Sequence, residues 1–334
     1  MSLSYTKVDI RGNAYKDVLG EILFSNNTIE KGYVTFADDV KANTIFTNTA
    51  HTVALQAYSS GAPSASGTIG VTDLIVTPYK FMAYDTFDME TMRTGRFSRD
   101  MKQGAWNLAS SEFEATVLNG IAPYISALAE TTFWNGATTA TKTAIAALTP
   151  GVGQGSVGAA EQTYAAAATS RLIDGVVTKM IYNNGALGTR IKVAGTTITS
   201  SNIFTEWGKL YAAANTALLH SATDTPVIYA PFDQLPLINQ YNSANTYKSD
   251  VFLVDIAKKT YSFQGIEIKF VPLPSNCMIL GTKRNFVWCT DLLDDTTYLE
   301  INKVQNNADT MFYKCIFTLE SLVRNQTFNT LYLG

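Results

Sequence analysis

The sequence has 334 residues and a formal net charge of −3, and only 16% of its residues are charged. An average soluble domain is about 25% charged, so this chain either buries much of its surface against partners or lies in a membrane. No stretch approaches the roughly 20 uninterrupted apolar residues of a membrane-spanning helix, and the first residues lack the apolar centre of a signal peptide. The composition therefore favours large protein–protein contacts made inside a cell, without the basic footprint of specific nucleic-acid recognition.

Cysteine usage agrees with an intracellular setting. Cys277, Cys289 and Cys315 are odd in number and far apart in the sequence. Without an export signal, buried free thiols in a reducing compartment are the simplest interpretation.

The N-terminal quarter is dominated by β patterns. A short amphipathic helix is predicted at Tyr15–Phe24, followed by a Thr-rich stretch with alternating apolar residues from Tyr33 to Tyr58. Small residues from Ser59 to Gly67 predict a loop tip, and a second β run covers Val71–Phe87. We expect one long two-stranded excursion, which is only marginally stable unless it lies across a neighbouring subunit.

The clearest helix is predicted from Ser111 to Trp134. Ser111 and Glu114 have the spacing of a capping box, and Asn135-Gly136 is a helix-ending pair. Pro123 predicts a kink in this helix. One apolar stripe, with spacings of three and four, consists of Val117, Leu118, Ile121, Ile125 and Leu128.

The middle of the chain mixes helices and strands. Residues 137–170 are rich in Ala, Thr and Gly and predict a surface insertion around one short helix, Ala159–Thr169. A second amphipathic helix is predicted at Asn202–His220. Its expected buried face consists of Ile203, Trp207, Leu210, Tyr211 and Leu218.

The last third is mostly β. A buried strand is predicted at Val227–Tyr229, and a short helix at Pro231–Tyr241, with proline at its start. Further β runs are predicted at Ile266–Val271, Met278–Leu280, Asn285–Trp288, Tyr298–Val304 and Met311–Val323. Without an internal repeat or strict βαβ alternation, the predicted fold class is α+β.

One stretch matches a nucleotide-binding fingerprint. Gly153–Gly158 reads G-x-G-x-x-G, and Asp174 follows at about the expected distance. The fingerprint has meaning only between a strand and a helix, and Thr149-Pro150 separates it from any preceding strand. We therefore interpret this stretch as a flexible glycine-rich loop.

Other candidates for chemistry are few. His51 and His220 lack Cys, His or carboxylate neighbours at metal-ligand spacing, and the acidic groups Asp38-Asp39 and Asp291 with Asp294-Asp295 are more typical of turns than of cation sites. His220 is expected at a helix end, where the helix dipole favours a cation. We predict no catalytic, cofactor-binding or metal-binding residue, and hence no enzyme.

The order of the predicted elements carries a resemblance. Val71–Asp88 looks like a strand returning from an extended loop, and Glu112–Gly136 looks like a spine helix with an Asn-Gly end. Met278–Glu300 is similar to a segment that crosses back between two domains, with Gly281 in its first strand. Together these stretches resemble the major capsid proteins of tailed bacteriophages, which share the Johnson fold.

The resemblance implies a domain organisation. It assigns residues 1–31 to an N-terminal arm and 32–70 to the extended β loop. Residues 71–136, with the spine helix 111–134, would form the peripheral domain. Residues 137–289 would form the axial domain, and 290–334 would return to the peripheral domain.

The resemblance also implies a function. Copies of the chain would form hexamers and pentamers of an icosahedral shell around double-stranded DNA, with portal, scaffold or decoration proteins as further partners and no membrane. The shell would be part of the virion, made in the host cytoplasm. The chain is expected to carry no large scaffold and to be used from Met1. Lys31 and Lys41 are expected to be solvated rather than crosslinked.

Three alternatives stay open. An encapsulin-type nanocompartment shares the fold that the resemblance implies. A tail or surface-layer protein would also be rich in interfaces and poor in histidine. A hydrolase or nucleotide-binding enzyme would use the Gly153–Gly158 loop.

Overall fold

A computed structural model describes most of the chain. It covers residues 27–52, 55–58, 60–61, 64, 66–88, 111–148, 158–182, 190–221, 224–244, 251–255, 260–291, 298–304 and 310–334. The helix predicted at Tyr15–Phe24 lies outside this part. None of the described helices combines the length with the apolar character of a membrane-spanning segment.

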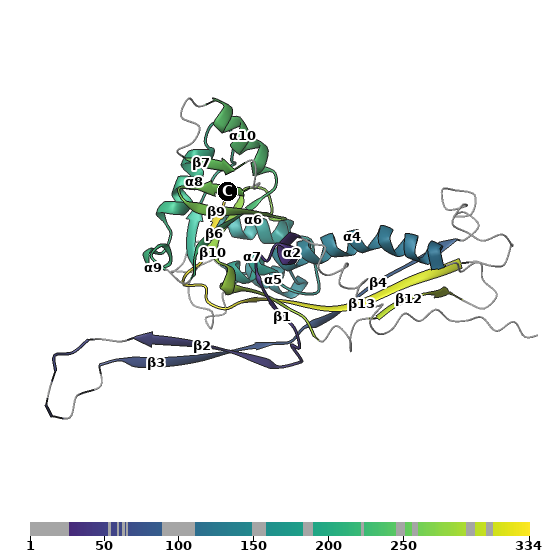
Figure 1. Cartoon of the computed structure of the whole chain (residues 1–334), viewed down its shortest axis with the longest axis horizontal. Helices are drawn as coiled ribbons and strands as arrows, with labels where there is room; N and C mark the ends of the chain where they lie inside the picture. The colour runs from purple at the N-terminus through teal and green to yellow at the C-terminus, as the bar shows by residue number, and fades with distance from the viewer. Residues whose placement is uncertain are drawn as a thin grey trace, which may run out of the picture.

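A long, narrow sheet forms one half of the molecule (Figure 1). Its central strand, β13 (Thr310–Val323), pairs along ten residues with β4 (Tyr79–Asp88). On its other side β13 pairs first with β12 (Tyr298–Lys303) and then with β11 (Phe286–Cys289). The short strand β1 (Thr35–Ala37) completes the sheet and runs parallel to β11.

The helix α4 (Ser111–Asn135) packs against this sheet and confirms the predicted helix to within one residue. It is continuous through Pro123, whose side chain is exposed. Ile125 is buried as expected, but Leu128 is 51% exposed, which corrects its place in the apolar stripe. The reason is that Ala129 and Phe133, one and five residues further, turn toward the sheet instead. The side chains of the predicted capping box lie outside the described part.

A second sheet, with seven strands, forms the other half. Its strands in spatial order are β5 (Ile191–Ala194), β14 (Thr330–Leu333), β10 (Cys277–Thr282), β6 (Pro226–Pro231), β9 (Ile266–Val271), β8 (Thr260–Phe263) and β7 (Phe252–Asp255). The mixed α+β class is therefore confirmed. Strands β5, β7, β8 and β14 were not predicted, because four residues are too few to show alternation.

Three helices pack on the seven-stranded sheet: α8 (Ile203–Ala212), α9 (Thr216–Leu219) and α10 (Gln234–Ala244). The predicted helix Asn202–His220 is wrong in its continuity. Asn215 interrupts it, because its side chain accepts a hydrogen bond from the backbone N–H of Ala217 (2.9 Å) and starts α9. The predicted buried face is confirmed for Ile203, Trp207, Leu210 and Leu218, while Tyr211 is half-buried.

Two other predicted boundaries are wrong. The helix expected from Pro231 begins at Gln234, because Pro231 still belongs to β6 and pairs with Val271. The β run Val71–Phe87 is two strands rather than one. It breaks at Thr77-Pro78, so that Tyr79 onward joins the long sheet and leaves the excursion.

The low-complexity region is also more ordered than predicted. Thr138 caps a helix that was not predicted, α5 (Thr139–Ala146), which packs against α6 (Ala159–Ala167). Ile145 and Ala165 are buried in the main core, so the region is not a mere surface insertion. Its Thr and Ala residues hide the helix from a hydrophobicity pattern. The short helices α2 (Asn27–Glu30) and α7 (Val176–Ile181) also line this core.

Candidate assembly surfaces

A two-stranded hairpin projects from the body, in the direction opposite to that of α4 (Figure 1). It consists of β2 (Thr44–Thr52) and β3 (Thr68–Val76), paired from Thr44 with Val76 to Thr52 with Thr68. At about 3.4 Å per residue, strands of this length reach about 30 Å. The prediction of a long two-stranded excursion is confirmed.

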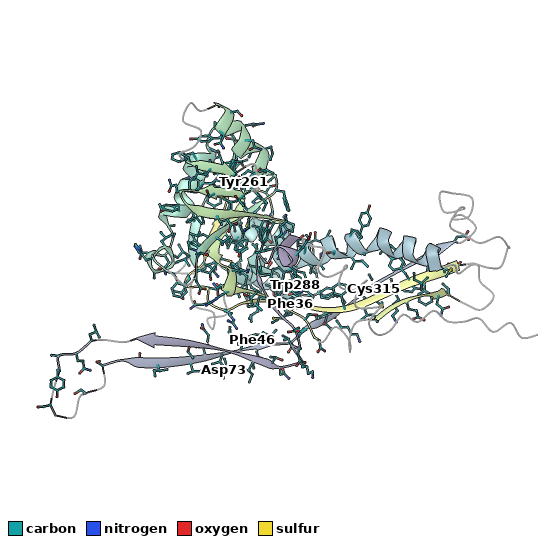
Figure 2. All side chains as sticks on the ribbon, viewed as in Figure 1. Phe36, Phe46, Asp73, Tyr261, Trp288 and Cys315 are labelled. Carbon is teal, nitrogen blue, oxygen red and sulfur yellow. The ribbon has the colours of Figure 1, made fainter. Side chains whose placement is uncertain are left out.

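One face of the hairpin base anchors it to the body. Leu74 and Val76 are buried, and Phe46 packs with them (Figure 2). The guanidinium of Arg324 lies 5.7 Å from the centre of the Phe46 ring. The body contributes Val287, Cys289 and Leu322 to this cluster, so the hairpin is fixed at its base by strands β11 and β13.

The opposite face of the hairpin is apolar and exposed. Successive side chains of a strand point to opposite faces. The odd-numbered residues between 45 and 51 and between 69 and 75 therefore share this face, which we call the outward face. Its large apolar side chains are 57–74% exposed: Ile45, Ile69, Val71 and Ile75. Asp73 lies among them and accepts a hydrogen bond from the Thr47 hydroxyl (2.9 Å). Exposed branched residues gathered on one face mark an interaction surface.

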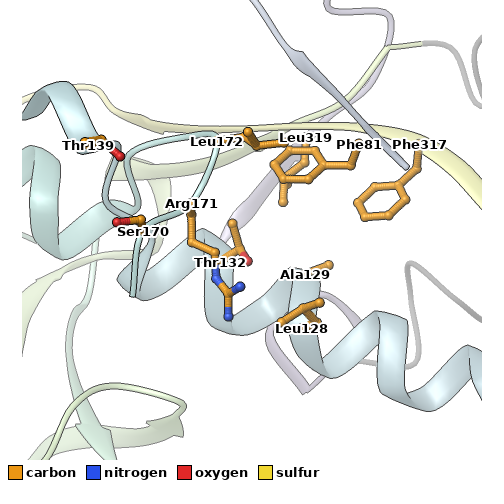
Figure 3. Close-up of a pocket in the computed structure, with 10 residues that line it drawn as sticks. All are labelled: Phe81, Leu128, Ala129, Thr132, Thr139, Ser170, Arg171, Leu172, Phe317 and Leu319. Carbon is orange, nitrogen blue, oxygen red and sulfur yellow. The ribbon is translucent and has the colours of Figure 1, made fainter. Parts of the chain in front are cut away.

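A groove of about 320 Å³ lies between α4, the long sheet and the segment that precedes α7 (Figure 3). Its floor includes Phe81 and Phe317, whose rings stack with centroids 5.4 Å apart. Its rim carries Leu128 and Leu172, which are 51% and 52% exposed. Arg171 also lines the groove and is its one charged residue in the described part of the chain. Sequence patterns did not reveal this groove, because its walls come from four distant segments.

The two halves of the molecule meet where β10 ends and β11 begins. The Asn285 side chain donates to Asn329 Oδ1 (2.7 Å) and accepts from the backbone N–H of Asn325 (2.7 Å). A Cβ on Gly281 would lie 2.6 Å from Asn329 Oδ1, so the close approach requires glycine. The stretch Met278–Glu300, in which the resemblance implies a crossing between domains, leads from β10 in the seven-stranded sheet to β11 in the long sheet.

Aromatic side chains from both halves pack against the last turn of α4. Phe133 stacks on Trp288 with centroids 4.8 Å apart, and Trp134 lies 5.1 Å from Tyr229. All four are fully buried. Burial of this much aromatic surface fixes α4 to both sheets at one point.

Buried ionisable groups near this core have partners. The Glu130 carboxylate accepts hydrogen bonds from the backbone N–H (2.9 Å) and the hydroxyl (2.5 Å) of Thr28, which in turn accepts from the Trp134 indole (2.9 Å). Burial raises the pKa of Glu130 despite these hydrogen bonds. Glu161 pairs with the fully buried Arg190 at 3.0 Å. These pairs join elements within one copy, which is a structural role.

The residues of the nucleotide-binding fingerprint have other roles where the structure describes them. Residues 149–157 lie outside the described part. Gly158 starts α6, follows the helix α5 and donates its N–H to the Glu161 carboxylate. Asp174 accepts hydrogen bonds from the Thr138 N–H (2.7 Å) and the Thr141 hydroxyl (2.6 Å), so it stabilises the start of α5. Among the described residues, the element before Gly158 is the helix α5 rather than a strand, so that part of the arrangement does not favour a nucleotide site.

The histidines are not brought together. His51 pairs with Ile69 in the hairpin, and His220 ends α9 as predicted, with an exposed side chain. Among the described residues, no group of His, Cys, Asp or Glu has the geometry to hold a metal ion.

Three of the acidic and basic candidates, Asp38, Asp39 and Lys41, lie in or beside a turn near the hairpin. Asp39 adopts a φ of 56° and pairs with the exposed Lys41 at 3.4 Å, while Asp38 is exposed. Lys31 lies 6.0 Å from the Tyr33 ring. The backbone N–H of Asp291 donates to the Thr318 hydroxyl (3.0 Å). Asp294 and Asp295 lie outside the described part.

The three cysteines are free and buried, as predicted. Burial raises the pKa of Cys277, and it raises the pKa of Cys289 and of Cys315 to about 12. Such thiols remain protonated and unreactive near neutral pH.

Comparison with known proteins gives a clear result for the fold. No family model and no curated protein matches the sequence. The structure, however, is similar to a chain of the satellite phage P4 procapsid, with a TM-score of 0.55 over 95% of this chain and 97% of that one, at 10% identity. The chain has the fold of phage capsid proteins.

Two further structures share this phage-capsid fold. A chain of the native GTA particle capsid matches with a TM-score of 0.52 at 11% identity, over 100% of this chain and 96% of that one. A chain of the capsid of Myoviridae phage XM1 matches with a TM-score of 0.52 at 10% identity, over 92% of each chain. The phage-capsid fold therefore extends over nearly the whole chain, as the resemblance implied.

Proposed function

We propose that this chain is the major capsid protein of a tailed phage and that its role is structural rather than catalytic. The shared fold supports this proposal. The observation that carries it is the hairpin, whose strands are about 30 Å long and whose outward face exposes Ile45, Ile69, Val71 and Ile75. In a lone subunit, these exposed side chains contribute no burial energy to folding. Contact with further copies buries them and stabilises an otherwise marginal two-stranded sheet.

The proposal includes the domain organisation that the resemblance implies. Residues 1–31 would be the arm, 32–70 the extended loop, and 71–136 the peripheral domain with its spine helix at 111–134. Residues 137–289 would be the axial domain, and 290–334 would return to the peripheral domain. The spine corresponds to α4, and the axial domain contains most of the seven-stranded sheet.

The assembled product would be a closed icosahedral shell of hexamers and pentamers in the virion, assembled in the host cytoplasm around double-stranded DNA. The net charge of −3 suits a wall that holds DNA without binding it tightly. Portal, scaffold or decoration proteins would act at the same shell. No membrane and no catalytic, cofactor or metal site is part of the proposal.

Expression of the full chain followed by electron microscopy tests the proposal. Closed shells, or rings of six and five subunits, are the expected products. Tubes or flat sheets would instead indicate a tail or surface-layer protein. A chain that stays monomeric at every concentration would refute the proposal. For closed shells isolated from infected or native cells, DNA inside supports a phage capsid, whereas a protein cargo would indicate a nanocompartment.

A further inference from the structure

One edge of the long sheet is open. Its edge strand, β4, pairs continuously with β13 along ten residues, and no other described strand pairs with it. At about 3.4 Å per residue, this edge is about 34 Å long. An open edge is a template for pairing with another chain, and proteins usually protect it with proline, a bulge or a short strand. β4 contains no proline and no bulge, and it is long.

The side chains of β4 differ between the two faces of the sheet. Phe81 and Phe87 pack with the core that includes α4. The even-numbered residues from 80 to 88 lie on the opposite face and are exposed, with exposed fractions of 61% for Met82 and 50% for Tyr84. Large apolar side chains beside an open edge indicate a site for a further strand.

A second copy of β4 fits this edge in one orientation. Two copies of the strand can pair antiparallel about a two-fold axis that is perpendicular to the sheet. This axis reverses the strand direction and keeps each face on its own side, so both copies of α4 lie on one side of a continuous sheet. A wall with an inside and an outside needs this arrangement. The axis also places odd-numbered residues opposite odd-numbered ones and even-numbered residues opposite even-numbered ones.

Charge selects one register for this pairing. When Tyr84 lies at the axis, Lys80 of each copy lies opposite Asp88 of the other, so the contact contains two pairs of opposite charge. On the other face, Phe81 of each copy lies opposite Phe87, and the two Tyr84 side chains meet at the centre. Cross-strand pairs of opposite charges and of aromatic rings both stabilise a sheet.

The neighbouring registers are less favourable. With Asp85 at the axis, two carboxylates lie directly opposite each other, which is destabilising. With Ala83 at the axis, Lys80 lies opposite Thr86, and Asp85 lies opposite the aromatic ring of Phe81. The register centred on Tyr84 is therefore self-complementary in its charges and in its aromatic contacts.

We infer that β4 pairs antiparallel with β4 of a second copy of this chain about a two-fold axis, with Tyr84 at the axis. This inference rests on the proposed function and adds a specific contact to it. Both copies use the same surface, so the contact joins two chains and stops there. Contacts between unlike surfaces build rings, whereas this contact would link one ring to the next, which a closed shell also requires.

A single cysteine tests the position of the axis. Tyr84→Cys places two thiols opposite each other at every contact, with Cβ atoms about 4.5–5.5 Å apart, which a small adjustment brings within disulfide range. Mild oxidation of assembled particles should link most chains into dimers, seen as one band at twice the chain mass on a non-reducing denaturing gel. The native cysteines are buried, and a thiol-blocking reagent present during denaturation keeps them from contributing.

Met82→Cys is the matched control, because Met82 lies on the same face of the same strand and is more exposed than Tyr84. In the inferred register the two Met82 positions are four residues apart, about 14 Å, so this variant should remain a single chain on the gel. Met82→Cys combined with Thr86→Cys should restore the dimer, because each thiol then faces one on the other copy. The inference is overturned if Tyr84→Cys gives no dimer or a ladder, or if Met82→Cys alone crosslinks equally well.

Charge at the axis tests whether the contact contributes to assembly. Tyr84→Lys alone, or Tyr84→Glu alone, places like charges opposite each other, and each should raise the chain concentration needed for assembly by about threefold or more. An equal mixture of the two variants pairs lysine with glutamate and should assemble at a lower concentration than either alone. Because Tyr84 is half exposed, the thermal midpoints of the unassembled variants should stay close to that of wild type, which separates assembly from folding. A mixture that assembles no better than its components overturns the inference.

Failures of the two proposals have different signatures. Closed shells in which oxidised Tyr84→Cys chains stay monomeric would refute the contact and leave the capsid function standing. Dimers that crosslink through Tyr84→Cys but never form shells would refute the capsid function and leave the contact standing. A chain that stays monomeric at every concentration refutes both.

Discussion

Replacing Phe133 with alanine should weaken the aromatic packing that joins the last turn of α4 to the sheets. The Phe133 ring is fully buried, stacks on Trp288 at 4.8 Å and meets Trp134 edge-on at 5.3 Å. A buried Phe→Ala change costs about 3–5 kcal/mol, which is a third or more of the total stability of many domains. Two aromatic contacts are lost as well, so we expect about 4 kcal/mol. Phe133→Leu keeps most of the volume and should cost about 1.5 kcal/mol.

The measurement is urea unfolding of the unassembled full chain, followed by tryptophan fluorescence. Tyr124→Ala is the matched control, because Tyr124 lies on the same helix and is 79% exposed; it should change stability by less than about 0.5 kcal/mol. A loss below about 1.5 kcal/mol for Phe133→Ala, or an equal loss for the control, would refute the view that the last turn of α4 holds the two halves together.

Three further predictions concern pH, close packing and thiols. Burial raises the pKa of Glu130, so the contribution of this group to stability is present at low pH and is lost as pH rises through the native pKa. Between about pH 4 and about pH 7, the thermal midpoint of the wild type should therefore fall more than that of Glu130→Gln. Parallel curves for the two proteins would contradict this prediction. Gly281→Ala should lower the free energy of unfolding in urea by about 1–3 kcal/mol, because the new Cβ would lie 2.6 Å from Asn329 Oδ1. Gly208→Ala is the control: nothing lies within 4 Å of its Cβ position, so the change should stabilise α8 by up to about 1 kcal/mol. A thiol reagent should label none of the three buried cysteines in the folded chain near neutral pH and all three in denaturant, and rapid labelling of the native chain would show that they are accessible.

Local patterns in the sequence predicted the elements whose cause is local. The helix from Ser111 ends in the helix-ending pair Asn135-Gly136, so its end was predicted to within one residue. The buried face of α8 followed from the spacing of Ile203, Trp207 and Leu210. Alternation did not mark the outward face of the hairpin, because Ile75 stands between Leu74 and Val76, which are buried on the other face.

Features that depend on distant partners could not be predicted in this way. Pro78 is a local signal for a break in the β run, but it does not indicate that β4 leaves the hairpin and pairs with β13. Four distant segments meet at the groove, and Arg171 directly follows residues 137–170, which were predicted to be a surface insertion. The exposure of Leu128 likewise depends on what packs beside it, which a helical stripe does not encode.

The position of β14 has a consequence for synthesis on the ribosome. Thr330–Leu333 inserts between β5 and β10, so among the described strands Ile191–Ala194 has no neighbour in that sheet until those four residues are synthesised. β4 likewise cannot pair with β13 until Thr310–Leu319 has been synthesised. Sheets closed by such long-range pairs fold late and slowly. A truncated or still nascent chain therefore lacks both completed sheets, and translation itself delays the moment at which a subunit becomes competent to join others.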